Sequence, residues 1–261
     1  MYHSVTFGDK NTWEDWCLIP ETDPIIVPPE QKTNLIDIPG ASGSLDMSES
    51  LTGYPTYNNR TGSLSFYVMN RYAATMPECD PKKIRNLASN IMNHFSGKGD
   101  MQMILEDDRA YFYRGRYKLE SVSPSETFTT LSIAYDVEPY KWSIYGSADN
   151  WIWDTFNFQI GRISSEFANL PVTTASNFVT LLDSMIGYAP VAPEFIVTAS
   201  NGQGIYIRFV NPTLGIDEER LVPTGTHVIH DFVMYGSGVF IYYRVSSGTG
   251  TLTINYRQGG L

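Results

Sequence analysis

The sequence predicts a mainly β protein of two domains with one well-specified α-helix, and three observations support this. The 261 residues include 17 Tyr, 13 Phe, 5 Trp and 21 Gly, and aromatic and turn-forming residues in this proportion favour strands over helices. Short segments of alternating apolar and polar residues recur along the chain, separated by turn signals. Hydrophobic residues make up 42% of the chain and charged residues 18%, which is too apolar for a disordered chain.

The first third of the chain shows repeated strand patterns. Alternation predicts strands at residues 2–7, 32–38 and 63–68. In the second of these, Leu35 and Asp37 point to one face, and Ile36 and Ile38 to the other. Four prolines in residues 20–30 predict an extended edge or excursion, since proline has no amide donor for a central strand.

One helix is predicted between residues 81 and 96. Asp80 can cap its first turn, and Pro81 suits the first helical position, where its missing N–H costs nothing. Gly97 can end the helix in the left-handed conformation. The apolar residues that recur at helical spacing and should form one buried face are Ile84, Leu87, Ile91, Met92 and Phe95.

The rest of the chain reads as further β-structure. The polar turn 106–108 joins predicted strands at residues 101–105 and 111–117, and residues 129–137 form another strand. A domain boundary is expected near residues 145–150, so the predicted domains are 1–147 and 148–261. In the second domain, strands at 205–209, 239–245 and 251–257 suggest a sandwich or jelly roll, whereas residues 177–186 fit a short helix.

The charge of the chain excludes one class of function. The net charge is −10, so there is no excess of Lys and Arg with which to bind nucleic acid electrostatically. Two distant cysteines indicate no disulfide framework, and a reducing compartment is expected. No run of about 18 apolar residues occurs, so membrane insertion is not expected.

The sequence supports no catalytic residue, no metal ligand and no cofactor, and an enzyme is not predicted. His227 and His230 are a close pair, but their i, i+3 spacing in a strand points them to opposite faces. The adjacent carboxylates Glu106, Asp107 and Asp108 resemble a solvated turn, because glycosidase carboxyls come from separate elements. A cell-wall hydrolase with a distant partner carboxylate remains a minor alternative.

Aromatic residues around position 150 allow two interpretations. Trp151 and Trp153 are two residues apart, and Phe156 and Phe158 follow with the same spacing between them. Such a row could form a carbohydrate-stacking platform, which would make the chain a carbohydrate-binding module contacting the bacterial cell surface. Burial of one strand face requires the same spacing, and a core strand is the favoured interpretation.

Several ordered segments carry a resemblance to a known family. In the first half these are residues 15–20, 28–29 and 32–46, then 51–57 with Arg60, then 107–108 leading into 111–116. At the C-terminus they are residues 248–257 and 259–261. Together these segments resemble siphophage distal tail proteins, the hubs of the tail tip or baseplate.

The resemblance implies a fold and a function. It implies an N-terminal ring-forming domain, a β-sandwich or split barrel similar to tail-tube proteins, and a C-terminal galectin-like β-sandwich. It also implies a homohexameric ring that joins the tail tube to the host-adsorption apparatus, with DNA passing through its channel without specific binding. The implied partners are the tail tube protein, the tape-measure protein, the tail-associated lysin or tip protein, and receptor-binding proteins. The implied location is the tail tip of the virion, assembled in the host bacterial cytoplasm.

A ring needs one interface that repeats about its axis. The proline-rich excursion suits such an interface, since a stiff segment loses little entropy on ordering. Candidate inter-subunit residues are Pro28, Pro29, Lys32, Asp37, Tyr54, Tyr57 and Arg60. For Pro28, Pro29, Tyr54, Tyr57 and Arg60, the alternative is that they only fold the N-terminal domain.

Overall fold

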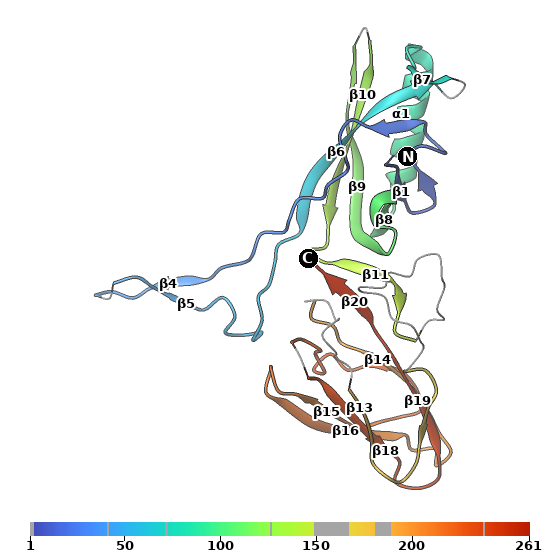
Figure 1. The fold of residues 1–261 in the computed structure, drawn as a ribbon. Helices are drawn as coiled ribbons and strands as arrows, with labels where there is room; N and C mark the ends of the chain where they lie inside the picture. Colours follow the sequence, from blue (N-terminus) through green and yellow to red (C-terminus); the bar gives the residue numbers. More distant parts are fainter. Residues whose placement is uncertain are drawn as a thin grey trace. The chain divides into compact units, whose positions relative to one another are not determined.

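The computed structural model describes residues 3–40, 42–70, 73–125, 127–148, 167–180, 189–236 and 238–261. It divides into two compact units, the first Met1–Lys141 and the second Trp142–Leu261, whereas the sequence suggested a boundary after residue 147. Strands dominate the described residues and α1 (Pro81–Phe95) is their one α-helix, which confirms the predicted fold class (Figure 1).

The first unit is built on a twisted antiparallel sheet with the strand order β2-β1-β8-β9-β10-β6-β3, and β7 pairs with the end of β6. The strands are β1 (Val5–Phe7), β2 (Lys10–Asn11), β3 (Leu18–Pro20), β6 (Arg60–Asn70), β7 (Ala73–Pro77), β8 (Met101–Leu105), β9 (Tyr111–Pro124) and β10 (Thr129–Val137). The predicted strands at 63–68 and 129–137 are therefore confirmed. Strand β10 is central, and its inward residues Leu131 and Ile133 are fully buried.

Helix α1 packs on this sheet through one apolar stripe. The Asp80 carboxylate accepts a hydrogen bond from the Lys82 amide at 2.9 Å, and Gly97 has a φ of 70°, so both predicted ends are confirmed. Phe95 contacts Phe7 edge-on, with ring centroids 5.4 Å apart. Met92 was predicted on the buried face but is 49% exposed, so that assignment is wrong.

The second unit contains two facing antiparallel sheets, with strand orders β12-β19-β14-β17 and β13-β18-β15-β16, while β20 pairs with β11. The strands are β11 (Lys141–Gly146), β12 (Leu170–Val172), β13 (Asn177–Thr180), β14 (Glu194–Ala199), β15 (Ile205–Asn211), β16 (Ile216–Val222), β17 (Gly225–Val228), β18 (Phe240–Arg244), β19 (Gly250–Asn255) and β20 (Arg257–Gly260). Residues from both sheets share one core, in which Phe195, Phe209 and Ile254 are fully buried.

One predicted element of the second unit is wrong in part. Residues 177–186 were predicted as a short helix, but residues 177–180 form strand β13, which pairs with β18 in antiparallel register. Phe178 packs against Tyr242 with the two rings tilted and their centroids 5.7 Å apart. Cross-strand pairing therefore outweighs the helical spacing of the apolar residues here.

Candidate assembly site: the arm

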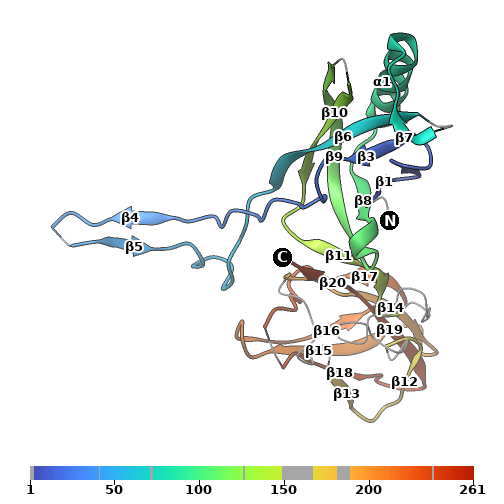
Figure 2. The same ribbon diagram turned by 45° about the horizontal axis from the view of Figure 1, so that its top comes forward.

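A long excursion, residues 30–58, leaves the first unit between β3 and β6; we call it the arm. Strand β4 (Leu35–Asp37) pairs with β5 (Ser44–Asp46), and Figures 1 and 2 show this hairpin standing apart from the other strands of the unit. At the root of the arm, the Lys32 amide donates to the Thr56 carbonyl and the Asn58 amide donates to the Glu30 carbonyl, both at 2.8 Å. The two sides of the arm are therefore joined by backbone hydrogen bonds.

Local polar contacts shape the tip of the arm. Gly40 and Gly43 both have a φ of 83°, which L-residues with a side chain rarely adopt, and they flank the reversal of the chain. Near the tip the Ser44 hydroxyl donates to the Asp37 carboxylate at 2.6 Å. Farther back, the hydroxyl and amide of Ser48 hydrogen-bond to Asp46 and lower the pKa of its carboxyl group. These bonds hold the turn without any apolar core.

The arm exposes apolar side chains on both of its faces. Leu35 and Ile36 are adjacent in β4, so they point to opposite faces, yet they are 59% and 47% exposed. The other exposed large apolar residues of the arm are Ile38, Leu45 and Leu51. A lone two-stranded hairpin is marginally stable in water, and burying a Leu or Ile fully is worth about 1.5–3 kcal/mol. A surface that covered the arm would therefore stabilise it substantially.

Arg60 secures the point where the arm returns to the sheet. Its side chain is buried, and Nε donates to the Pro139 carbonyl at 2.8 Å while the guanidinium lies 5.6 Å from the ring centre of Tyr113. Burial lowers its pKa, and the nearby Tyr113 partly offsets this effect. Among the described residues, no carboxylate pairs with this guanidinium and Nη2 has no hydrogen-bond partner.

The predicted interface residues all lie on the arm or at its root, but they differ in exposure. Tyr57 and Tyr140 pack edge to face near the root, with ring centroids 5.9 Å apart. The exposed residues are Pro28, Lys32 and Asp37; the half-buried ones are Pro29, Tyr54 and Tyr57; Arg60 is buried. Trp151 and Trp153 lie outside the described residues.

Sequence reasoning missed the apolar residues that dominate the surface of the arm. The strand at 32–38 was identified, but its exposed Leu35, Ile36 and Ile38 were not proposed as interface residues. The signal was present in the sequence, because a strand with one solvated face should not carry apolar residues on both faces. A strand with apolar residues on both faces must be covered on both sides, either by other layers of its own chain or by another protein.

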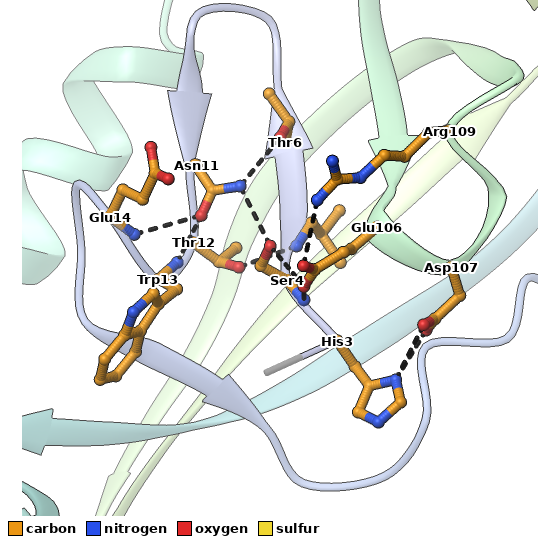
Figure 3. A network of polar contacts seen from close by, with 11 residues as sticks. His3, Ser4, Thr6, Asn11, Thr12, Trp13, Glu14, Glu106, Asp107 and Arg109 are labelled. Carbon is orange, nitrogen blue, oxygen red and sulfur yellow. Dashed lines mark hydrogen bonds and ion pairs between the residues drawn. The ribbon is translucent and has the colours of Figure 1, made fainter. Parts of the chain in front are cut away.

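The carboxylates of the turn between β8 and β9 stabilise the fold of the first unit. This turn is the 3₁₀-helix η1 (Glu106–Asp108). Glu106 accepts hydrogen bonds from the amide and hydroxyl of Ser4 at 2.8 and 3.0 Å, and Arg109 donates to its other oxygen at 3.1 Å (Figure 3). The Ser4 amide is the main reason that the pKa of Glu106 is lowered.

The other two carboxylates of the turn are paired with basic side chains. Asp107 hydrogen-bonds to Nδ1 of His3 at 2.8 Å and raises the pKa of His3 (Figure 3). Asp108 accepts a hydrogen bond from Lys141 at 2.6 Å. All three acids therefore hold neighbouring segments in place. Within the described residues, no group of three or more His, Cys, Asp or Glu side chains is placed to hold a metal ion. None of the helices in this part of the chain is long and apolar enough to cross a membrane.

Comparison with known proteins finds a solved structure that shares the fold of this chain. No protein-family model and no curated protein matches the chain. Its mainly β fold of two units is, however, shared with a hub protein of a phage adsorption apparatus. That protein is Dit (gp 19.1) of SPP1, described as a paradigm for phages that infect Gram-positive bacteria. The two structures align with a TM-score of 0.55 over 97% of this chain and 98% of Dit, at 10% sequence identity. This alignment confirms the resemblance to distal tail proteins at the level of the fold.

Proposed function

We propose that this chain is a structural hub of a siphophage tail tip or baseplate. In this proposal, six copies form a ring that joins the tail tube to the host-adsorption apparatus and leaves a channel for DNA. The role is mechanical, so no substrate is turned over. The shared fold with the SPP1 hub supports this class of function.

The exposed apolar arm is the observation that carries the proposal. Its side chains have no core of their own, and five large apolar residues of the arm are exposed. Covering each half-exposed Leu or Ile would contribute about 1 kcal/mol, so a neighbouring copy would stabilise the arm by several times that amount. When each copy offers its arm to the next, the contact is head-to-tail, and a head-to-tail contact generates a ring if the rotation closes.

Within this interface, the predicted residues take different roles. Pro28, Lys32 and Asp37 are exposed and are proposed to contact the neighbouring copy. Tyr57 and Arg60 pack into the first unit and are proposed to hold the root of the arm at a fixed angle.

The charge of the chain suits a conduit for DNA. Each copy carries a net charge of −10, so a ring of six copies is strongly negative overall. A negative assembly repels phosphate groups, which disfavours adhesion of passing DNA. The proposed partners are the tail tube protein, the tape-measure protein, the tail-associated lysin or tip protein and the receptor-binding proteins. The proposed location is the virion tail tip, reached after assembly in the host bacterial cytoplasm.

Electron microscopy of the purified chain tests this proposal directly. We expect closed rings with six subunits around a central hole. The matched variant replaces residues 33–55 with a short Gly-Ser linker, which removes the exposed apolar residues but keeps the hydrogen bonds at the root. This variant should fold and remain monomeric. A chain that stays monomeric even when mixed with the tail tube and tip proteins would contradict the proposal.

A further inference from the structure

The sheet β13-β18-β15-β16 of the second unit has an outer face whose side chains are not part of the core. In β15 the inward residues Ile205, Ile207 and Phe209 are fully buried, while Tyr206 and Arg208 alternate with them and point outward. The same alternation occurs in β18, where Tyr242 and Arg244 point outward. We call this surface the tyrosine–arginine face; its residues are Phe178, Tyr206, Arg208, Asp217, Glu219, Tyr242 and Arg244.

The strand register aligns these side chains in rows across four neighbouring strands. Phe178 is opposite Tyr242, Tyr242 is opposite Arg208, and Arg208 is opposite Glu219. In the next row, Arg244 is opposite Tyr206. Figure 2 shows β13, β18, β15 and β16 together in the second unit. Strands β15 and β16 form a hairpin, and β13 and β18, which are distant from it in sequence, complete the same surface.

Each guanidinium on this face is fixed between a ring and a carboxylate. Arg208 lies 5.8 Å from the ring centre of Tyr242 and donates through Nε and Nη2 to Asp217, both at 2.7 Å. Arg244 lies 4.6 Å from the ring centre of Tyr206 and donates through Nη2 to Glu219 at 3.0 Å. Side chains held in this way lose little entropy when a ligand binds, so the face is preorganised.

The face encloses a cavity of about 260 Å³, lined by Ser176, Tyr206, Arg208, Glu219, Tyr242, Tyr243 and Arg244. This volume is below the range of roughly 300–1,000 Å³ that is usual for drug-sized ligands, so it suits a single ring with its substituents. Hydroxyl, guanidinium and carboxylate groups surround the same space as the aromatic rings. The cavity therefore combines an apolar platform with hydrogen-bond donors and acceptors.

The charges of the face select the class of ligand. Two arginines are balanced by Asp217 and Glu219, and the whole chain is acidic, so an anionic ligand gains nothing here. A neutral sugar ring has C–H groups that pack on an aromatic side chain and hydroxyls that both donate and accept hydrogen bonds. Within the described residues, the carboxylate bonds leave N–H groups of both guanidiniums available to donate.

We propose that the tyrosine–arginine face binds a neutral saccharide, with one hexose ring in the cavity against Tyr242. Arg208 and Arg244 would donate to its hydroxyls, and Glu219 would accept from one. The Arg208–Asp217 pair stays ionised over a wide pH range, because Asp217 raises the pKa of Arg208 and Arg208 lowers that of Asp217. The inference goes beyond the hub function, since a ring could form without any sugar site.

Binding of the intact chain to immobilised neutral oligosaccharides of glucose, galactose and N-acetylglucosamine tests this inference. The best oligosaccharide is then titrated calorimetrically. We expect Tyr242→Ala and Arg208→Ala each to weaken binding about tenfold, as lost stacking or a lost charged hydrogen bond would, and Tyr242→Phe to bind within about twofold of the parent. The matched control is Ile196→Ala, an exposed residue of the other sheet of the same unit, which should leave binding unchanged.

Two results would overturn the inference. One is that none of the neutral oligosaccharides binds at millimolar concentration. The other is that the Tyr242→Ala and Arg208→Ala variants bind the best oligosaccharide as tightly as the parent chain does. Electron microscopy of the same preparations separates this inference from the hub proposal: a six-membered ring that binds no sugar overturns only the sugar site.

Discussion

Arg60 donates from Nε to the carbonyl oxygen of Pro139 at 2.8 Å, and this bond joins the returning side of the arm to the end of β10. The guanidinium is buried, and among the described residues it has carbonyl groups and aromatic rings as neighbours but no carboxylate. Burying a guanidinium without a carboxylate partner costs free energy of folding. Arg60 is therefore expected to contribute something that a smaller apolar residue would not. Its contribution is geometric, because together with the Tyr57–Tyr140 contact it connects the returning side of the arm to the segment that follows β10.

Substitution of Arg60 should therefore loosen the root of the arm. We expect Arg60→Ala to lower the free energy of unfolding by about 2–3 kcal/mol, because it removes a charged hydrogen bond and leaves a void. Hydrogen exchange should also speed up at the amides of Lys32 and Asn58. The control is Arg114→Ala, an exposed residue of β9, which should cost less than about 0.5 kcal/mol. Equal effects of the two substitutions would contradict this role for Arg60.

The apolar residues of the arm should affect assembly far more than stability. The triple variant Leu35→Ser, Ile36→Ser and Leu45→Ser is expected to unfold within about 1 kcal/mol of the parent, since these side chains are exposed in the single chain. Association of subunits should weaken at least about tenfold, as for loss of central interface residues. Urea unfolding and mass photometry measure the two quantities. Ile196→Ser, exposed in the second unit, should leave both unchanged, and a triple variant that assembles like the parent would disprove the role of the arm.

The Glu106 carboxylate should make stability depend on pH in the acid range. Its pKa in the folded protein is lowered, chiefly by the Ser4 amide, from an ordinary value of 4.5. The ionised form is thus favoured by folding, so the stabilisation is complete above the unfolded pKa and is lost as the pH falls through the lowered value.

Glu106→Gln tests this pH dependence. It should cost about 1 kcal/mol at neutral pH and much less once the pH falls below the lowered pKa, where the parent carboxyl is itself protonated. Urea unfolding across this pH range measures the difference. Glu14→Gln, at an exposed position, is a suitable control and should cost less than about 0.5 kcal/mol. A constant cost of Glu106→Gln at every pH would refute the linkage.

Gly115 occupies a position in β9 that should not accept a side chain. A Cβ atom there would collide with the backbone carbonyl of Asp136 in the neighbouring strand β10. We expect Gly115→Ala to destabilise the first unit by about 2 kcal/mol, because the two strands would have to separate. Thermal unfolding is the measurement. Gly99→Ala is the matched control, since its Cβ would meet nothing within 4 Å, and a similar loss in both variants would exclude the collision as the cause.

Local sequence signals predicted much of this fold. Asp80 and Pro81 fixed the start of α1, because capping depends only on neighbouring residues. Met92 was misplaced because it lies at the border of the apolar stripe, whereas the buried residues of the helix are Ile84, Ala88, Ile91 and Phe95. Residues 177–180 were misassigned because Phe178 pairs with Tyr242, which is distant in sequence. The pairing of Phe178 with Tyr242 therefore cannot be predicted from a local sequence pattern.

The candidate sites were less predictable than the fold. The root of the arm was located through its prolines and tyrosines, whereas the tyrosine–arginine face was missed. Its four main residues occur as two short alternations, Tyr206 with Arg208 and Tyr242 with Arg244. Each alternation alone is typical of any solvated strand face. Only the register between β15 and β18 brings them together.

In the proposed ring, the hairpin at the end of the arm has a consequence for how complete assemblies form. In an open row of copies, the hairpin of one terminal copy and the receiving surface of the other terminal copy stay exposed to solvent. Closing the ring covers both at once, so the last subunit is held at two sites instead of one. Mass action then favours closed rings over open fragments, and incomplete intermediates should be scarce.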